Sequence, residues 1–523
     1  MHERLSYVTG SDNASFWVLV VSLLALLLVW RLRTKALPLP PGPPRHFFVG
    51  NAPDLPRKFG HLGFDALCKK YGDIVYLDAF GIPLIILGTQ QAALDLLERR
   101  SATYSDRRFS VMANLTGFSW FFAVNPYGPK WRKARRAFLE TMNPNAIPQY
   151  RSVGERAVRR YLLRVLEEPD KYRSNALYMY NATIIAVAYG LDVHAKSENH
   201  KYVKIAEQTM KSFHEAFTLG GSHVERFPIL RHFPSWFPLA GFKRKLPEWS
   251  ADARRLRDEP WEAAMTALNE GRATSSMASI LTGDANTEEE VTIAKGACAS
   301  AYAGMYFSMF ATFAMFMAAM VLFPETQQRA QAELDSVIGP DRLPDIRDKE
   351  QLPYLSALLV EVFRWQPVVP TGVSHLAMEE DEYRGYRIPR GAVIIPNPWA
   401  YSRDANLYPD PEEFRPERFL KDGKLELGDL DPSTSVFGYG RRICPGRHFA
   451  EEMVFTTIAS LLHCFDISGP KDKDGHPVKF ELKFMNVSPM LPEEFECNIR
   501  PRTEAAESLI RAVCSESELA EMI

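Results

Sequence analysis

The sequence predicts a mainly α-helical protein with small β-sheets. Residues 296–323 form an uncharged run of 28 residues, which is far longer than a strand and predicts a long helix. Glu361 and Arg364 lie three residues apart in the amphipathic stretch LVEVFRW, where they share one helix face. By contrast, residues 386–388 and 393–395 are short β-branched or aromatic runs flanked by glycine and proline, which is typical of short strands.

Length and composition indicate one large domain. The chain has 523 residues, of which 46% are hydrophobic, so it can bury a substantial core. No interior linker divides it, and we expect residues 46–523 to form a single domain. The net charge of −2 gives no reason to expect a nucleic-acid partner. The six cysteines lack the paired spacing of zinc sites or disulfide frameworks, which fits a reducing compartment.

The N-terminal segment predicts a single membrane anchor. Residues 14–30 are 17 residues without a charge, and as a helix they rise about 26 Å, which just spans a bilayer core. Arg31, Arg33 and Lys35 follow, and basic flanks stay cytosolic, so residues 1–36 hold a lumenal end and the anchor. A cleaved signal peptide is the rival interpretation, but no small-residue cleavage site follows the run. Residues 37–45 are a stiff proline-rich hinge.

The stretch FGYGRRICPGRHFA, residues 437–450, carries the strongest chemical signal. A metal-bound thiolate needs backbone N–H groups close to the sulfur, and Gly440 and Gly446 allow this approach around Cys444 because they lack a Cβ. Phe437 is placed to cover the sulfur, and Arg442 to meet an anionic group of the ligand. The alternative interpretation is a buried structural cysteine.

The spacing Phe-x-x-Gly-x-Arg-x-Cys-x-Gly resembles the heme-binding loop of cytochrome P-450, the heme-thiolate monooxygenases. The resemblance covers roughly residues 38–501 and implies the P-450 fold, with heme b bound through Cys444 and Arg442. A cysteine axial ligand favours O–O bond cleavage. Trp131 and Arg135, in WRKAR, resemble the family's heme-propionate pair.

Other positions resemble supporting parts of the same site. His375, in VSHLAM, stands where many relatives present a third propionate donor, although a lone histidine is as often a plain core residue. Glu361, Arg364 and Arg418, the last in FRPERF, resemble a structural triad that holds the heme loop in place. Since both halves of the chain contact one heme, residues 296–323 are expected to be a buried core helix and not a second membrane span. Its small residues are expected to lie against the flat macrocycle.

The distal helix departs from the family pattern. Where relatives carry an acid and two threonines, residues 304–309 read GMYFSM, with Phe307 in place of the acid and Ser308 in place of the first threonine. A shifted alignment puts Tyr306 and Phe307 at these sites and restores no acid. Ser308 keeps a hydroxyl for the proton transfer that relatives use to release water from dioxygen. Either ordered water and substrate supply the protons, or the reaction does not need the usual delivery.

The expected pocket walls are almost uncharged, which predicts an apolar small-molecule substrate. Besides the turn at residues 488–491, they are Phe109, Met112, Leu115, Phe118, Trp120, Phe121, Phe122, Phe213, Phe217, Met305, Tyr306, Phe310, Val368, Val369 and Val373; about half of such an apolar set is expected to be core.

The resemblance also implies a partner and a location. Such enzymes take electrons from an NADPH-dependent diflavin reductase, for which Lys130, Arg132, Lys133, Arg136 and Arg447 form a candidate basic face. The wording of the loop looks most like fungal microsomal members in the endoplasmic reticulum membrane that tailor terpenoid, polyketide or indole scaffolds in secondary metabolism. Two alternatives remain open: a reductase-independent isomerase or dehydratase, and a non-catalytic heme or lipid binder.

Overall fold

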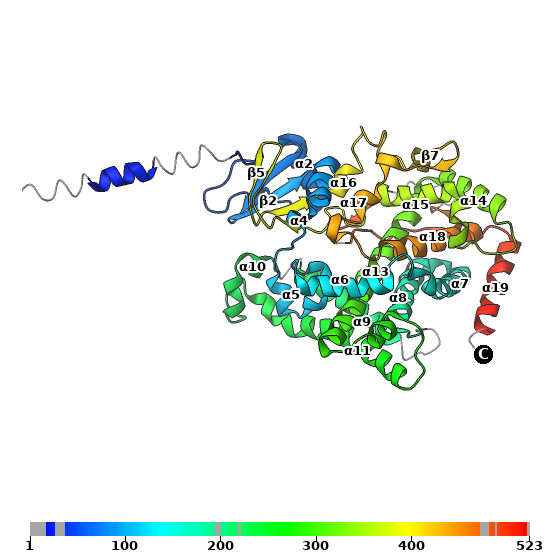
Figure 1. The fold of residues 1–523 in the computed structure, drawn as a ribbon. Helices are drawn as coiled ribbons and strands as arrows, with labels where there is room; N and C mark the ends of the chain where they lie inside the picture. Colours follow the sequence, from blue (N-terminus) through cyan, green and yellow to red (C-terminus); the bar gives the residue numbers. More distant parts are fainter. Residues whose placement is uncertain are drawn as a thin grey trace, which may run out of the picture.

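The structure, a computed structural model, describes residues 17–26, 37–193, 200–217, 221–470, 481–486 and 489–519. It is mostly helical, as predicted (Figure 1). The long helices are α6 (Pro129–Met142), α7 (Arg151–Glu167), α8 (Tyr172–Tyr189), α9 (His200–Glu215), α11 (Leu246–Asn269), α13 (Glu288–Leu322), α14 (Pro324–Val337), α15 (Pro353–Trp365), α18 (Arg447–Cys464) and α19 (Glu504–Leu519). Shorter helices include α2 (Gly60–Tyr71), α5 (Val111–Leu115), α10 (Gly221–Arg226), α12 (Met277–Gly283), α16 (Pro398–Tyr401) and α17 (Ser433–Val436).

The strands form small sheets. The largest sheet has the order β1 (Ile74–Ala79), β2 (Ile82–Leu87), β6 (Val393–Pro396) and β3 (His375–Leu376), with β2 and β6 parallel and the other pairs antiparallel. Two-stranded pairs join β4 (Asp381–Tyr383) to β5 (Tyr386–Ile388), β7 (Leu420–Lys421) to β8 (Lys424–Leu425), β9 (Phe465–Ser468) to β12 (Asn498–Pro501), and β10 (Phe484–Met485) to β11 (Leu491–Pro492). The strands predicted at residues 386–388 and 393–395 are thus confirmed.

Helix α13 is the central element of the core. It begins with a capping box, in which the Thr287 hydroxyl accepts from the Glu290 N–H and the Glu290 carboxylate accepts from the Thr287 N–H. It ends before Pro324, which cannot continue the helix and begins α14. Within α13, 78% of the most apolar 18-residue window is buried. The run at residues 296–323 is therefore a core helix, as predicted.

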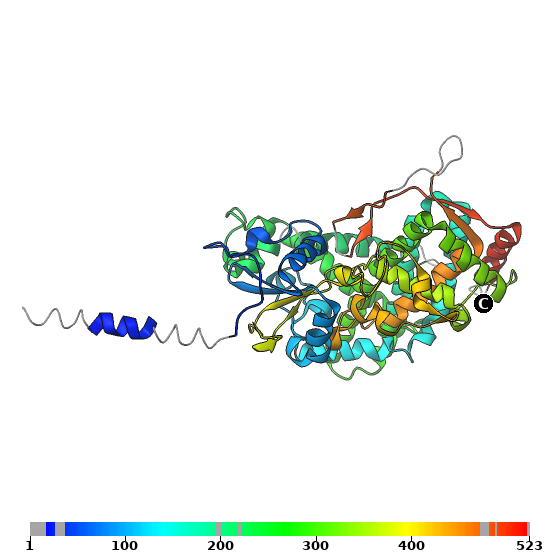
Figure 2. The same cartoon turned by 90° about the horizontal axis from the view of Figure 1, so that it is seen from above.

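Helix α13 brings the two halves of the chain together. It packs against α6, α8 and α11 from the N-terminal half and against α15 and α18 from the C-terminal half. Figures 1 and 2 show it crossing the helical part of the molecule, with the four-stranded sheet and α2 at one end. A group bound between α13 and the start of α18 is thereby enclosed by both halves.

The proline-rich hinge is docked on the sheet. The Pro41 carbonyl oxygen accepts from the Tyr76 N–H at 2.9 Å, and the Asn51 side-chain amide donates to the carbonyl oxygens of Pro43 and Pro44 at 3.1 and 3.2 Å. A Cβ on Gly42 would lie 2.1 Å from the Tyr76 carbonyl oxygen, so only glycine fits there. The hinge is therefore held against β1.

Candidate functional site

Cys444 lies in a tight loop between the short helix η14 (Gly440–Arg442) and α18. Its backbone N–H donates to the Phe437 carbonyl oxygen at 2.7 Å and closes the loop. Burial raises the pKa of the Cys444 thiol, while a hydrogen bond from the Gly446 N–H and the charges of Arg135 and Arg447 act in the opposite direction. A bound metal cation would complete the stabilisation of the thiolate.

The two glycines singled out in this loop meet different neighbours. Gly446 donates to the sulfur, and a Cβ on it would lie 3.0 Å from Cε of Met305. Gly440 has φ +49°, and a Cβ there would lie 2.7 Å from the Leu97 carbonyl oxygen. Gly440 is therefore required by packing against residues 97–101, and not by the sulfur as we expected. The ring of Phe437 packs edge-on against Phe363 of α15, with 5.2 Å between ring centres.

Two buried arginines lie side by side near Trp131 with donors to spare. Arg442 donates to the carbonyl oxygens of Ser105 and Asn125 at 2.7 and 2.9 Å, and Arg107 donates to those of Val373 and Ser374. Among the residues that the structure describes, Nη1 of Arg442 and Nε of Arg107 are buried without a hydrogen-bond partner.

The electrostatics of this pair fit an anionic ligand. Burial lowers the pKa of Arg107 to about 9 and that of Arg442 to about 10, and the charge of Arg442 adds to the depression at Arg107. Asp106 is the acid that opposes both shifts. Buried cations are normally paired. An anionic ligand fits beside them.

His375 belongs to the same cluster. It is 3% exposed on β3, and its Nδ1 lies 2.7 Å from the Tyr104 carbonyl oxygen. Burial, followed by the charge of Arg107, lowers the pKa of His375 well below 6.5, and Arg442 adds to this. A negative group between the arginines would remove that repulsion. The structure thus places His375 beside the predicted Arg442.

Trp131 and Arg135, the two predicted site residues of α6, contact the Cys444 loop. Trp131 is 4% exposed, and the guanidinium of Arg442 stacks 4.2 Å from its ring centre. Arg135, one turn further along α6, donates to the Ile443 carbonyl oxygen at 2.7 Å. Arg135 therefore fixes the backbone of the residue that precedes Cys444, and the Trp131 ring packs against the Arg442 guanidinium.

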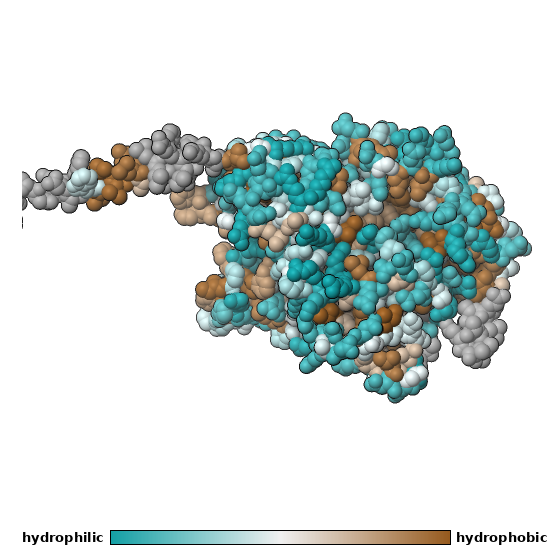
Figure 3. All heavy atoms as spheres, viewed as in Figure 1, coloured by the Kyte–Doolittle hydropathy of each residue, from teal (hydrophilic) through white to brown (hydrophobic). Residues whose placement is uncertain are grey.

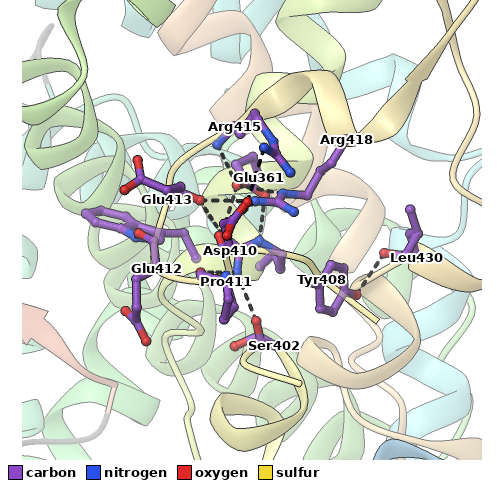
Figure 4. A network of polar contacts seen from close by, with 12 residues as sticks. Glu361, Ser402, Tyr408, Asp410, Pro411, Glu412, Glu413, Arg415, Arg418 and Leu430 are labelled. Carbon is purple, nitrogen blue, oxygen red and sulfur yellow. Dashed lines mark hydrogen bonds and ion pairs between the residues drawn. The ribbon is translucent and has the colours of Figure 1, made fainter. Parts of the chain in front are cut away.

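Glu361, Arg364 and Arg418 meet in a buried network. Arg364 donates to both carboxylate oxygens of Glu361 at 2.6 and 2.8 Å, and Arg418 donates to one of them at 3.1 Å. Figure 4 shows Arg418 and the backbone of Arg415 converging on Glu361, whose side chain is fully buried. Arg364 also donates to the Pro411 carbonyl oxygen at 2.7 Å. The triad thereby fixes the segment that leads to the Cys444 loop.

On the distal side, α13 presents the turn at residues 304–309. Ser308 is half-buried, and its Oγ donates to the carbonyl oxygens of Gly304 and Met305, both at 3.0 Å. Tyr306 is 1% exposed, and burial together with the charge of Glu207 on α9 raises the pKa of its hydroxyl. Burial also raises the pKa of Glu207. Residues 291–322 of α13 contain no acid, and the acid whose charge contributes to the raised pKa of Tyr306 lies on α9.

The small residues of α13 receive an aromatic segment that the sequence did not predict, while their contact with a flat macrocycle stays a prediction. The Ser300 hydroxyl lies 3.3 Å from the Trp120 carbonyl oxygen, and a Cβ on Gly304 would lie 3.7 Å from the ring of Phe121. Trp120 ends the short helix η3 (Phe118–Trp120). The small side chains of glycine and serine let this bulky aromatic loop approach the axis of α13.

The predicted pocket residues fall into two groups. An aromatic wall, defined as Phe118, Phe121, Phe213 and Phe217, joins η3 to α9, with ring centres 5.2 Å apart for Phe118 and Phe213 and 4.4 Å apart for Phe213 and Phe217. Met112, Tyr306 and Phe310 are packed in the core as deeply as Phe118 of the wall, with exposures of 0%, 1%, 4% and 1%. Phe109 and Val373 form the second group, because they are exposed, at 55% and 48%. Ser488 lies outside the described residues.

The sequence as a whole matches a known family. A model of the family described as Cytochrome P450 matches residues 40–493. The chain belongs to the cytochrome P450 family. It is 36% identical to "Cytochrome P450 monooxygenase COX2" of Coprinopsis cinerea over 91% of this chain and 92% of the relative. It is also 35% identical to "Cytochrome P450 monooxygenase 98" of Postia placenta over 91% of this chain and 93% of the relative.

Membership defines the cofactor and the class of enzyme. A cytochrome P450 is an oxidoreductase that holds heme b through a cysteine thiolate. The residues present fit this group on two independent grounds. A half-buried thiol with an N–H donor stands just before the start of α18, and unsatisfied guanidinium donors stand where propionates would supply negative charge.

Sequence reasoning missed Arg107 as a member of this P450 site. The segment SDRRFS contains two adjacent arginines, and only Arg107 turns inward, with 8% exposure. Arg108 instead donates to the backbone of Glu225 on α10. The signal was present as a basic pair beside the buried Tyr104 and Ser105, but a single sequence does not tell which arginine of the pair is buried.

Proposed function

We propose that this cytochrome P450 is a membrane-anchored monooxygenase that oxidises an apolar small molecule. The observation that carries the proposal is that α13 contacts both the Cys444 loop and the uncharged aromatic wall: its Met305 lies against Gly446, and its Gly304 lies against Phe121. In this proposal one atom of dioxygen enters the substrate and the other leaves as water, with electrons drawn from NADPH. Bound heme supplies the redox chemistry, and its thiolate ligand favours O–O cleavage.

Each site residue has a proposed role. Cys444 would supply the thiolate that holds the heme iron, and the Gly446 N–H would stabilise that thiolate. Arg107, Arg442, Trp131 and His375 hold the propionates. Arg135 clamps the loop through Ile443, and the triad of Glu361, Arg364 and Arg418 locks the segment before it. The roles of Arg107 and Arg442 follow from their buried donors without partners, and those of Trp131 and His375 from their places beside Arg442 and Arg107.

Ser308 is proposed to hold a proton on the distal side. Its hydroxyl bonds back to its own helix, so it can accept a hydrogen bond from water or substrate while it donates to a carbonyl oxygen. Phe307, the residue before it, has no group that can carry a proton.

A membrane location is supported by two features of the described residues. Residues 17–26 form an apolar helix, while the rest of the predicted anchor and its basic flank at Arg31, Arg33 and Lys35 lie outside the described residues. Large apolar side chains are also exposed on the body: Phe47, Phe48, Phe227, Ile229, Trp236 and Leu239. Figure 3 shows hydrophobic surface around α10, at the end where the body begins. We propose a single-pass anchor in the endoplasmic reticulum, with the body cytosolic.

The electron donor is proposed to be an NADPH-dependent diflavin reductase. Lys130, Arg132 and Arg136 are exposed on α6, the helix that carries Trp131 and Arg135. Lys133 forms an ion pair with Glu289 at 2.6 Å, and the half-buried Arg447 lies 3.3 Å from the Cys444 carbonyl oxygen. The proposed docking face is therefore reduced from the five predicted cations to Lys130, Arg132 and Arg136 on α6. Positive charges of this kind suit an acidic partner.

The biological setting is proposed from the relatives. Those named above are fungal P450 monooxygenases, and the apolar wall suits a terpenoid, polyketide or indole scaffold of secondary metabolism. Comparing metabolites of strains with and without the gene identifies the substrate. Purified enzyme with reductase, NADPH and that substrate should consume NADPH and form a product heavier by one oxygen atom.

A second candidate function is a reductase-independent isomerase or dehydratase. The absence of an acid from α13 between residues 291 and 323 favours it. Product formation without NADPH and reductase would establish this alternative and overturn the monooxygenase proposal.

A further inference from the structure

Met305 of α13 packs on the glycine that donates to the Cys444 sulfur. A Cβ on Gly446 would lie 3.0 Å from Cε and 3.2 Å from Sδ of Met305. Met305 is 7% exposed, and its thioether belongs to the packing of α13 against α18. We expected Met305 in a wall of the substrate pocket, and the structure instead places the end of its side chain against the cysteine loop.

The Cys444 sulfur depends on this glycine because the residue between them is Pro445. Proline has no backbone N–H, so the first N–H after Cys444 belongs to Gly446, and it donates to the sulfur. The Gly446 carbonyl oxygen accepts from the Ala450 N–H at 3.0 Å in the first turn of α18. A shift of Gly446 away from Cys444 would therefore weaken a hydrogen bond that Pro445 cannot replace.

The hydrogen bond to the sulfur has a measurable consequence. An N–H donor draws electron density from a thiolate, so the thiolate donates less charge to a metal that it holds. The metal then accepts an electron more readily, and hydrogen bonding around the ligand is one of the means by which a protein adjusts a heme potential. The distance of Gly446 from the sulfur therefore affects the reduction potential of the site.

Met305 is suited to keep Gly446 in place. A methionine side chain adapts to irregular gaps, and a close-packed interior transmits a displacement from one neighbour to the next. Helix α13 is held by helices from both halves of the chain, so it is a firm support for the side chain. The Met305 carbonyl oxygen also accepts from the Ser308 hydroxyl at 3.0 Å, which joins this support to the distal turn.

We propose that Met305 is a positioning residue that holds the Gly446 N–H on the Cys444 sulfur and thereby raises the reduction potential of the bound heme. This inference rests on the proposed role of Cys444 as the residue that holds the heme iron. In this role Met305 acts through Gly446 and not on the reacting atoms.

The test measures the reduction potential of the full-length holoenzyme by spectroelectrochemical titration. Met305→Ala removes the atoms that meet Gly446 and should lengthen the hydrogen bond to the sulfur. Reduction of the iron should become up to about tenfold less favourable, which for a one-electron couple is a shift of about 59 mV to lower potential. Met305→Leu should stay close to the wild type, because swaps that conserve volume disturb a core least.

A double-mutant cycle tests whether the two residues act through their contact. Gly446→Ala inserts a Cβ against Met305, and the Gly446 φ of −95° is one that alanine also adopts. We expect the Cβ to displace the Gly446 N–H and lower the potential in this variant. In the double variant the new methyl group occupies the space that Met305→Ala opens, so its potential should lie closer to the wild type than that of either single variant.

A second readout does not depend on the electron. Amide hydrogen exchange of Gly446 in the holoenzyme should accelerate in Met305→Ala, because its N–H is held less firmly on the sulfur. The matched control is Met317→Ala. Met317 is a fully buried methionine of the same helix, about 18 Å further along it, so its truncation also opens a cavity but should change neither measurement.

The outcomes separate this inference from the proposed function. Wild-type potential and wild-type exchange in Met305→Ala would overturn the inference, and so would an equal shift of potential in Met317→Ala. If Met305→Ala does not fold, Met305→Val takes its place, since it also lacks the Sδ and Cε atoms, and an unchanged potential there overturns the inference equally. A wild-type protein without a thiolate-heme spectrum would instead overturn the proposed role of Cys444.

Discussion

The guanidinium of Arg442 lies 4.2 Å from the ring centre of Trp131. One residue stands two positions before Cys444, and the other on α6 in the opposite half of the chain. The contact places a cation from the cysteine loop on an indole from the N-terminal half. The inward-facing Arg107 lies beside them, and its charge lowers the pKa of the neighbouring His375. One anionic ligand can therefore be held by both halves at once.

Arg107→Met should weaken heme retention. The buried guanidinium loses a charge-assisted hydrogen bond to a propionate, which is worth about 1.5 to 3 kcal/mol. We expect heme to transfer to apomyoglobin at least tenfold faster than from the wild type. Arg108→Met is the control, because Arg108 points to Glu225 and not to the site. Equal transfer rates in Arg107→Met and wild type would contradict the assignment of Arg107.

Cys444→Ala should abolish the thiolate-ligated heme spectrum, measured as the Soret band of the reduced carbon monoxide complex. Cys464→Ala is the matched control, since Cys464 is fully buried at the far end of α18 and carries no ligand role. An unchanged band in Cys444→Ala would end the heme-thiolate interpretation of this site.

Removal of residues 1–36 should release most of the protein from carbonate-resistant membranes while heme content stays largely intact. The described heme-site residues begin at Arg107, well beyond the deletion. The exposed apolar side chains near α10 should leave some reversible membrane affinity. Full carbonate resistance of the truncated protein would mean that the anchor lies elsewhere in the chain.

Ser308→Ala should lower the product formed per NADPH consumed and raise peroxide, because a lost acid–base contact costs about 10² to 10⁴-fold. Added peroxide should partly bypass the defect. Ser300→Ala serves as the control, as its hydroxyl lies on the same helix but bonds to the Gly296 carbonyl oxygen at 2.7 Å. Unchanged coupling in Ser308→Ala would leave water or a substrate hydroxyl as the proton source.

Glu361→Gln should destabilise the fold by about 3 to 5 kcal/mol, because it leaves buried arginines without their counter-charge. Urea unfolding followed by tryptophan fluorescence measures the loss. Asp335→Asn is the control: it breaks a pair with Arg502 in which the aspartate is 53% exposed, and such pairs contribute at most about 1 kcal/mol. Similar losses of unfolding free energy in both variants would show that the buried triad contributes no more to stability than an exposed ion pair.

Local patterns predicted much of the fold and part of the site. The uncharged run at residues 296–323, the strands at 386–388 and 393–395, and the pairing of Glu361 with Arg364 all depend on neighbours a few residues away. Helix and strand periodicity is a local property, so one sequence carries it. By contrast, the loop pattern predicts that Gly440 lets the backbone approach the Cys444 sulfur, whereas in the structure Gly440 packs against Leu97.

The sequence by itself determined the chemistry, because Cys444 and its loop neighbours stand within ten residues of one another and share one backbone turn. Only the tertiary structure decided which arginine of the pair 107 and 108 turns inward, which aromatic rings cover the small residues of α13, and that Glu225 ties α10 to α5. Each of these depends on contacts between segments far apart in the chain. Their energy depends on burial and on partner geometry, and no local pattern records either.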